Sequence, residues 1–257
     1  MRIHFKDKKP VKTRFSKPSS PIECAQLDEM KRAKIIYEVE RPTQYCASFF
    51  LVAKPSRKTR PITNYKALSK KMDPPKFYLP SLYQLVENLE WSGKLHYLSL
   101  DLRQAFYNIP LHKASQFVTC FRAGGRFWQY NVLPFGLGLA PFVCQTFTQA
   151  ICDFALREGI QIAKGHIDDM LFADQNPVLL KTVVDRIVEK LSRIRWRVNF
   201  DKSVLEPTDD IVHLGARWSG DGTVTRTPAA SKLVHDLLIE LELLPTRAGK
   251  RQPYLLC

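Results

Sequence analysis

The stretch Gly165-His166-Ile167-Asp168-Asp169-Met170-Leu171-Phe172 carries the strongest structural signal in this sequence. Two adjacent carboxylates among apolar residues are costly, because like charges repel and burial disfavours both charged forms. A divalent cation between them would remove that cost. Since successive strand residues point to opposite faces, both aspartates can approach one ion only at a tight turn. The stretch therefore predicts a β-hairpin with acidic residues at its turn; an ordinary solvent-exposed turn is the simpler alternative.

A third carboxylate, Asp101, ends the apolar stretch His96-Tyr97-Leu98-Ser99-Leu100-Asp101, which predicts a strand. The simpler interpretation of Asp101 is a helix N-cap. Three strand-borne carboxylates in a basic protein instead favour phosphoryl transfer with two metal ions. Magnesium suits oxygen ligands that leave room for water and substrate phosphates. We therefore expect Asp101, Asp168 and Asp169 to bind two Mg²⁺ ions, or Mn²⁺ in their place.

The composition indicates a polyanionic partner. The 257 residues include 39 Lys and Arg against 25 Asp and Glu, a formal net charge of +14. Such a surplus points first to nucleic acid and second to an anionic membrane surface. No apolar run approaches the length of a membrane span, so no membrane partner is expected. Hydrophobic residues make up 45% of the chain, which is enough for a core and argues against wholesale disorder.

The six cysteines, at positions 24, 46, 120, 144, 152 and 257, form no Cys-x-x-Cys pair and do not cluster with histidines. A zinc site is therefore not expected, and a reducing compartment fits. The N-terminus has no apolar signal-peptide core. We expect an intracellular protein, in the nucleus or the cytoplasm, that is not secreted. The oligomeric state is left open by the sequence.

Sheet hairpins and helices alternate without a strict βαβ rhythm, which favours an α+β fold. Apolar periodicity predicts a helix over about 25–37 and a longer one from Pro141 to about Arg157. The expected buried stripe of the longer helix is Phe142, Val143, Phe147, Ile151 and Phe154. The other expected elements are strands at Ala47–Lys54 and from near Thr59, a short helix opened by Pro80 and Ser81, a hairpin turned by Gly124-Gly125, an amphipathic helix through Val184 and Leu191, and a last helix capped by Thr227-Pro228.

Several stretches resemble the motifs of reverse transcriptases, in the same order and spacing. Leu98–Leu111 resembles the first catalytic motif, Leu133–Pro141 the nucleotide-binding motif, and His166–Asp169 the Tyr-x-Asp-Asp box, with His166 in place of the usual tyrosine. The weaker similarities are Leu27–Ser69 to the fingers, Val198–Ser203 to the lysine motif and Val212–Gly215 to the primer grip. The resemblance covers about 25–220 and is closest to LTR-type retrotransposons, either gypsy-like or DIRS-like with a tyrosine recombinase.

This resemblance implies a right-hand polymerase with fingers, a palm built on an antiparallel sheet, and a reduced thumb. The implied divisions are a basic N-terminal tail at 1–22, fingers at 23–76, palm at 77–108, fingers at 109–138, palm at 139–219, and a thumb remnant with a C-terminal tail at 220–257.

The resemblance also implies roles for individual residues. Asp101 and Asp168 would ligate both metal ions, and Asp169 would be more peripheral. Arg60 would contact the incoming triphosphate through bidentate bonds, with help from Lys54 or Lys58. The remaining implied roles are Phe106 as the steric gate against a ribose 2′-hydroxyl, Phe135 and Gly136 as the lining of the nucleotide and template side, Lys202 as a proton donor to pyrophosphate, and His213, Leu214 and Gly215 as the primer grip.

The expected reaction is templated attack of a primer 3′-hydroxyl on a deoxynucleoside triphosphate, with an RNA or DNA template and primer as partners. Three alternatives stay open. An RNA-templated RNA polymerase would need room for the 2′-hydroxyl, and Phe106 argues against it. A catalytically inactive, retroelement-derived nucleic-acid-binding fragment is favoured by the short segment after 220 and opposed by the three intact aspartates. The third is a decayed fragment that does not fold stably alone.

Overall fold

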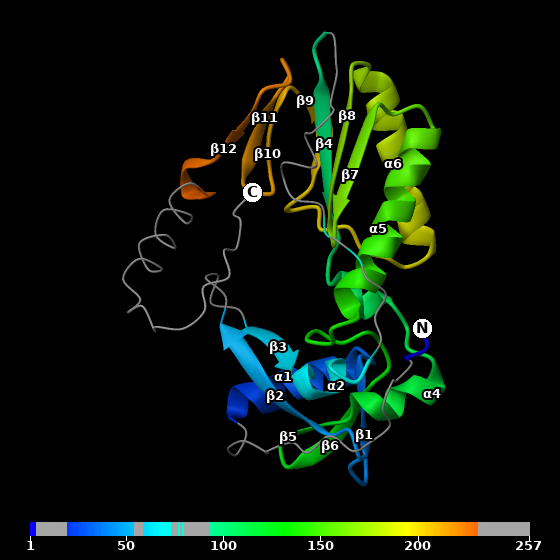
Figure 1. Ribbon diagram of the computed structural model, residues 1–257, viewed down its shortest axis with the longest axis vertical. Helices are drawn as coiled ribbons and strands as arrows, with labels where there is room; N and C mark the ends of the chain where they lie inside the picture. Colours follow the sequence, from blue (N-terminus) through cyan, green and yellow to red (C-terminus); the bar gives the residue numbers. More distant parts are fainter. Residues whose placement is uncertain (4–19, 54–58, 73–76, 78, 80–92, 231–257) are drawn as a thin grey trace, which may run out of the picture.

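The structure is a computed structural model of the chain, and it describes residues 1–3, 20–53, 59–72, 77, 79 and 93–230. The predictions for Lys54 and Lys58, for the helix opened by Pro80 and for the last helix beyond Ala230 lie outside the described residues. Figure 1 shows the described part as two lobes, one built on β1, β2, β3, β5 and β6, the other on the remaining strands.

The first lobe holds a five-stranded sheet in the order β1-β6-β5-β2-β3 within the described residues. Its strands are β1 (Ile36–Val39), β2 (Ala47–Ala53), β3 (Thr59–Thr63), β5 (Phe121–Ala123) and β6 (Arg126–Tyr130). Its helical elements are α1 (Pro21–Arg32), α2 (Lys66–Ser69), α4 (Lys113–Gln116) and η2 (Phe117–Thr119). The short helix η1 (Ala105–Asn108) lies between the lobes, because Ala105 is in the core of the second lobe and Phe106 packs against both cores. The predicted strand at 47–54 and the hairpin at Gly124-Gly125 are confirmed. Neighbouring strands are antiparallel except β2 and β5, which run parallel and so join two segments far apart in sequence.

The helix predicted over 25–37 is wrong at both ends. It begins at Pro21 because Ser20 caps it: the Glu23 N–H donates to the Ser20 hydroxyl at 3.2 Å, and the Ser20 N–H donates to the Glu23 carboxylate at 3.1 Å. It ends at Arg32 because Lys34 turns the chain with φ of 57°. Ile36, expected on the helix, starts β1 instead.

The predicted N-terminal tail also differs where the structure describes it. Pro21 and Ile22 belong to α1, and the Met1 amine donates to the Pro110 carbonyl at 2.9 Å. Ile3 is buried against the first lobe, and its N–H donates to the Ser115 hydroxyl at 2.9 Å. The first residues of the predicted tail therefore pack on the first lobe, and its last two residues are helical but exposed.

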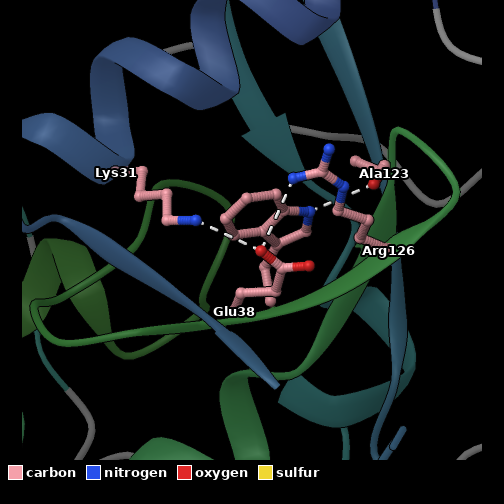
Figure 2. A network of polar contacts seen from close by, with 5 residues as sticks. Lys31, Glu38, Ala123 and Arg126 are labelled. Atoms are coloured by element: carbon pink, nitrogen blue, oxygen red, sulfur yellow. Dashed lines mark hydrogen bonds and ion pairs between the residues drawn. The ribbon is translucent and has the colours of Figure 1, made fainter. Parts of the chain in front are cut away.

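Glu38 on β1 links α1 to β6 (Figure 2). Its carboxylate lies 3.2 Å from the Lys31 amine and 3.5 Å from the Arg126 guanidinium. These ion pairs are partly exposed, so each contributes about 1 kcal/mol or less. The larger stabilisation comes from Trp128 beneath them, which is buried and donates its indole N–H to the Ala123 carbonyl at 3.0 Å.

The second lobe is a four-stranded antiparallel sheet in the order β7-β8-β4-β9 within the described residues. Its strands are β4 (His96–Asp101), β7 (Ile162–His166), β8 (Asp169–Asp174) and β9 (Val204–Thr208). Two long helices, α5 (Ala140–Arg157) and α6 (Pro177–Arg193), cover one face (Figure 1). The amphipathic pattern predicted through Val184 and Leu191 is confirmed, because both face the core.

A small sheet covers the opposite face of β4 and β8. It consists of β10 (Asp210–His213), β11 (Ala216–Ser219) and β12 (Val224–Arg226). Tyr97 and Leu171 pack against this sheet, whereas Leu98 and Phe172 face the helices. Adjacent residues of one strand thus enter two cores, which explains why the interior positions of β4 and β8 are apolar on both faces, with Ser99 the exception. Because β12 pairs with β11, the palm boundary predicted at 219 falls inside this sheet.

The buried residues of α5 are not the ones predicted. The fully buried residues are small ones, Ala140, Cys144, Thr148, Cys152 and Ala155. The predicted aromatic and aliphatic residues are only partly buried at the flanks of this face. The physical reason is the close approach of α5 to β7, where large side chains do not fit. None of the helices in the described segments is long and apolar enough to cross a membrane.

Candidate active site

Two strand ends bring the predicted carboxylates together. In the register of β4 and β8, Asp101 lies opposite Asp169. Asp168 occupies the two-residue turn between β7 and β8, and its carbonyl accepts the Leu102 N–H at 2.9 Å. We call β7, the turn Ile167-Asp168 and β8 the catalytic hairpin. The predicted hairpin with acidic residues at its turn is confirmed, and it lies beside the strand that ends in Asp101.

The site concentrates negative charge where water has limited access. Burial raises the pKa of Asp168, and the neighbouring Asp101 raises it further. Burial, followed by the charges of Asp168 and Asp101, raises the pKa of Asp169 to about 7. Lys202 acts in the opposite direction on both carboxyls. Crowded carboxylates of this kind gain from an added positive charge.

Asp101 is held by a turn that follows α6. Its carboxylate accepts the Asn199 amide N–H at 2.8 Å and lies 3.2 Å from the Lys202 amine. Its backbone N–H donates to the Ser203 hydroxyl at 3.0 Å. Lys202 was a predicted site residue, and the structure places it at the carboxylates. Asn199 was quoted only as part of a motif and given no role, because nothing in a lone asparagine marks it as a partner of Asp101.

The donor set suits a hard divalent cation, since it consists of carboxylate oxygens. In the described part of the chain, no three His, Cys, Asp or Glu side chains are gathered closely enough to hold a metal ion as they stand. Both oxygens of Asp101 already have partners, one in Asn199 and one in Lys202. Lys202 is 68% exposed and Asp101 only 14%, so the lysine is the partner that can leave. The residues fit a metal centre once Asp101 gives up its contact with Lys202.

The turn of the catalytic hairpin is conformationally strained. Ile167 has φ of 58°, a region that costs a β-branched residue about 1–3 kcal/mol. Such a residue persists only where its surroundings hold it. Three side chains from α5, those of Cys144, Gln145 and Thr148, bond to the backbone here. None of the three was predicted, because polar residues on a helix are ordinarily taken as solvated and small ones as packing.

An aromatic cluster lies between the two lobes, beside the aspartates. Phe106 contacts Phe135 edge-on, with ring centroids 4.7 Å apart. The guanidinium of Arg60 lies over the Phe135 ring at 5.4 Å from its centroid. Arg60 lowers the pKa of Asp168, although burial and Asp101 outweigh it. The predicted steric gate, triphosphate ligand and nucleotide-lining residue are therefore brought into one cluster.

Gly136 fixes this cluster to β3. Its φ is 93°, and a Cβ atom there would lie 2.2 Å from the Thr63 carbonyl oxygen. Only glycine allows the backbone to approach so closely. The glycine at position 136 of the predicted nucleotide-binding motif thus has a steric reason.

The predicted primer-grip residues form a second tight turn. We call β10, the turn Leu214-Gly215 and β11 the primer-grip hairpin. Leu214 and Gly215 both have positive φ, 51° and 76°. His213 is buried, and burial together with His166 lowers its pKa to about 4. This electrostatic coupling places His213 near the catalytic hairpin, since His166 pairs with Asp169.

Carboxylates at adjacent strand ends of an antiparallel sheet, with an arginine and aromatic side chains beside them, are the arrangement expected in the palm of a right-hand polymerase. A family model described as reverse transcriptase (RNA-dependent DNA polymerase) matches residues 52–217. The match covers more than half of the chain, so the chain belongs to the reverse transcriptase family.

Curated relatives include viral and transposon proteins. Protein P of heron hepatitis B virus is 32% identical over 210 residues, which cover 79% of this chain and 26% of that protein. Protein P of duck hepatitis B virus (strain China) is 31% identical over 201 residues, 75% of this chain and 25% of that protein. The retrovirus-related Pol polyprotein from transposon 412 of Drosophila melanogaster is 31% identical over 148 residues, 54% of this chain and 12% of that protein. The chain therefore spans about a quarter or less of these relatives.

Solved structures confirm the right-hand polymerase fold. The foamy viral protease-reverse transcriptase in complex with dsDNA superposes with a TM-score of 0.73 at 20% identity, covering 92% of this chain and 48% of that one. The same viral protein in complex with RNA/DNA hybrid gives a TM-score of 0.71 at 18% identity, covering 89% of this chain and 30% of that one.

Proposed function

We propose that this chain is an RNA-directed DNA polymerase that extends a primer by templated nucleotidyl transfer. The observation that carries the proposal is the alignment of Asp101 with Asp169, with Asp168 in the adjoining turn. Burial and mutual repulsion raise the pKa of both Asp168 and Asp169. A site with this charge deficit is suited to cations and to the phosphates that cations bring.

Asp101 and Asp168 would hold two divalent ions, Mg²⁺ or Mn²⁺, with Asp169 more peripheral. When bound, the ions would activate the primer 3′-hydroxyl and stabilise the leaving pyrophosphate. Lys202 would leave Asp101 on loading and remain close enough to donate a proton to the pyrophosphate. Asn199 would keep hold of Asp101 during this exchange, because it bonds the other carboxylate oxygen.

The aromatic cluster would bind the incoming deoxynucleoside triphosphate. Arg60, positioned on Phe135, would contact the triphosphate, and the exposed backbone of Gly136 would line the nucleotide and template side. Phe106 would press on the sugar and exclude a ribose 2′-hydroxyl. Phe106→Val should therefore narrow the ratio of kcat/KM for deoxynucleotides over ribonucleotides while deoxynucleotide use is largely kept. An unchanged ratio would mean that Phe106 only packs against Phe135.

The template partner would be an RNA or DNA strand paired with a primer. The net charge of +14 supports a polyanionic ligand. The foamy viral proteins with the same fold are described in complexes with dsDNA and with RNA/DNA hybrid. His213, Leu214 and Gly215 would contact the primer backbone near its 3′ end.

The two lobes support the assignment of fingers to 23–76 and 109–138 and of palm to 77–108 and 139–219, with the palm continuing through β12. Segments 36–53, 59–63 and 121–130 supply the sheet of the first lobe. We assign the chain to a retrotransposon of the gypsy-like or DIRS-like kind, supported by the similarity to transposon 412. We also place the protein inside the cell, in the nucleus or cytoplasm, as the free thiols of Cys46 and Cys120 suggest.

Primer extension on an RNA template tests the proposal. The full chain with Mg²⁺ or Mn²⁺ should lengthen a DNA primer with deoxynucleotides, and removal of the metal by EDTA should stop it. Salt-sensitive binding of the primer–template without extension under either metal would instead support the non-catalytic nucleic-acid-binding alternative. The ion pair of Lys202 with Asp101 is the observation that favours this second candidate.

A further inference from the structure

Both backbone polar groups of Ile167, the strained residue of the catalytic hairpin, bond to helix α5. The Ile167 N–H donates to the side-chain oxygen of Gln145 at 2.7 Å. The Ile167 carbonyl accepts the Thr148 hydroxyl, and also the Cys144 thiol at 3.3 Å. The conformation with φ of 58° is thus supported by side chains of one helix, and not by the strand ladder.

Gln145 makes a second bond to the same hairpin. Its amide nitrogen donates to the Gly165 carbonyl at 2.9 Å. A side-chain amide has one donor end and one acceptor end, so the Gly165 carbonyl and the Ile167 N–H fix which way round it lies. A flipped amide would lose both bonds. Gln145 therefore sets the position of the backbone on both sides of His166.

The contact requires the helix and the hairpin to be very close. Residues 144, 145 and 148 lie on neighbouring positions of one helix face. A Cβ atom at Gly165 would lie only 2.4 Å from the Thr148 methyl carbon. Glycine in β7 and small residues in α5 bring the helix close enough for the side chains of Cys144, Gln145 and Thr148 to reach the turn.

The bonds act on the catalytic carboxylates through one peptide unit. Ile167 directly precedes Asp168, whose carbonyl accepts the N–H of the residue after Asp101 at 2.9 Å. We propose that Gln145 is a positioning residue that, with Thr148, fixes Asp168 relative to Asp101. The inference rests on the proposed function for its effect on rate, but the bonds themselves can be tested without any activity.

The test compares Gln145→Met with a matched control, Gln149→Met, in the full chain. Gln149 lies one turn further along α5 and donates to the exposed Asp153 carboxylate, away from the hairpin. The measurements are amide hydrogen exchange of the segment that contains Ile167, Tm, primer–template Kd and single-turnover extension. Gln145→Met should speed exchange at Ile167 at least tenfold and lower the extension rate by about tenfold to a hundredfold. Tm and Kd should stay close to those of the wild type. The control Gln149→Met should match the wild type in all four measurements.

Unchanged exchange at Ile167 would overturn the proposal, as would an extension rate within twofold of the wild type. A fall in Tm and in the extension rate together with weaker primer–template binding, that is a higher Kd, would show a general structural role and would also overturn the proposal. If Gln145→Met does not fold, Thr148→Val and Thr148→Ser are compared instead. Only the serine variant keeps the hydroxyl, so it should extend the primer at least fivefold faster than the valine variant. Equal rates would contradict the proposal. A wild type that extends nothing would sink the proposed function, while hydrogen exchange would still decide whether Gln145 holds the turn.

Discussion

The catalytic hairpin and the primer-grip hairpin reverse direction in similar ways but are held differently. Each turn contains a non-glycine residue with positive φ, Ile167 at 58° and Leu214 at 51°. In the first, side chains of α5 bond to the turn. In the second, the Gly215 carbonyl accepts the Thr227 N–H at 2.9 Å and the Thr227 hydroxyl at 3.1 Å, just after β12. The catalytic turn is thus held by side chains of a preceding helix, whereas the primer-grip turn is held by Thr227, 12 residues further along the chain.

The two hairpins also respond oppositely to pH. The pKa of Asp169 is raised, so its contribution to stability is present below the unfolded value and is lost as pH rises through about 7. The pKa of His213 is lowered to about 4, so its contribution is present at neutral pH and is lost as pH falls from about 6.5 towards 4. Lowering the pH therefore increases the contribution of Asp169 to stability and decreases that of His213.

The largest expected effect is on the carboxylates at the end of the catalytic hairpin. Asp101→Asn and Asp168→Asn should each lower the extension rate by roughly a thousandfold or more, because a lost metal ligand removes several kcal/mol of transition-state stabilisation. Asp169→Asn should be milder. Single-nucleotide extension measures the rates, with Asp185→Asn on the exposed face of α6 as control. Near wild-type extension by Asp168→Asn would refute the mechanism.

The next effect tests the dependence on α5. Gly165→Ala should displace the hairpin, because its new methyl carbon would lie 2.4 Å from Thr148 Cγ2, and should slow extension by about tenfold or more. Adding Thr148→Ser removes that methyl group and keeps the hydroxyl. The double variant should recover part of the rate, although Cys152 Sγ remains 3.1 Å from the new atom. If Thr148→Ser does not raise the extension rate of Gly165→Ala, the loss of rate does not come from the clash with the Thr148 methyl group.

His213 provides a smaller effect, which is measured on the stability of the fold. Lowering the pH from 7 to 5 should reduce the free energy of unfolding by about 2 kcal/mol, because the buried His213 stays neutral and only the unfolded state takes up the proton. His213→Phe cannot be protonated, so its urea midpoint should fall less over this range than that of the wild type. The two proteins are compared by urea denaturation at both pH values. An equal change of the urea midpoint with pH in the two proteins would show that His213 is protonated in the folded state.

The smallest effect separates backbone strain from contact in the primer grip. Gly215→Ala should cost about 1–2 kcal/mol, since φ is 76° and the new Cβ would lie 3.3 Å from the Ala230 Cβ. Gly125→Ala is the matched control, with φ of 73° and nothing within 4 Å. Both should lose similar stability in urea denaturation, but only Gly215→Ala should weaken primer–template binding. Equal binding by the two variants would remove Gly215 from the primer contact.

The sequence predicts the parts of this fold whose signals are local. The interior positions of β4 and β8, other than Ser99, are apolar because both faces of these strands are buried, and the adjacent aspartates interrupt that pattern at the turn. The start of α1 was missed because Ser20 lies in a basic, proline-containing stretch that resembles a linker, although Ser20 and Glu23 form a capping box. Gln145 and Asn199 could not be found because their partners are backbone or carboxylate groups distant in sequence, and a single sequence does not record such pairs.

The order of strands in the palm sheet also has a consequence for synthesis of the chain. Strand β4 lies between β8 and β9, both of which follow it in sequence. A growing polypeptide therefore exposes Leu98 and Leu100, fully buried in the finished protein, before either neighbouring strand has left the ribosome. Non-local pairing of this kind forms slowly and leaves an apolar edge open to other chains. The nascent chain should therefore need protection from aggregation until β8 and β9 have emerged.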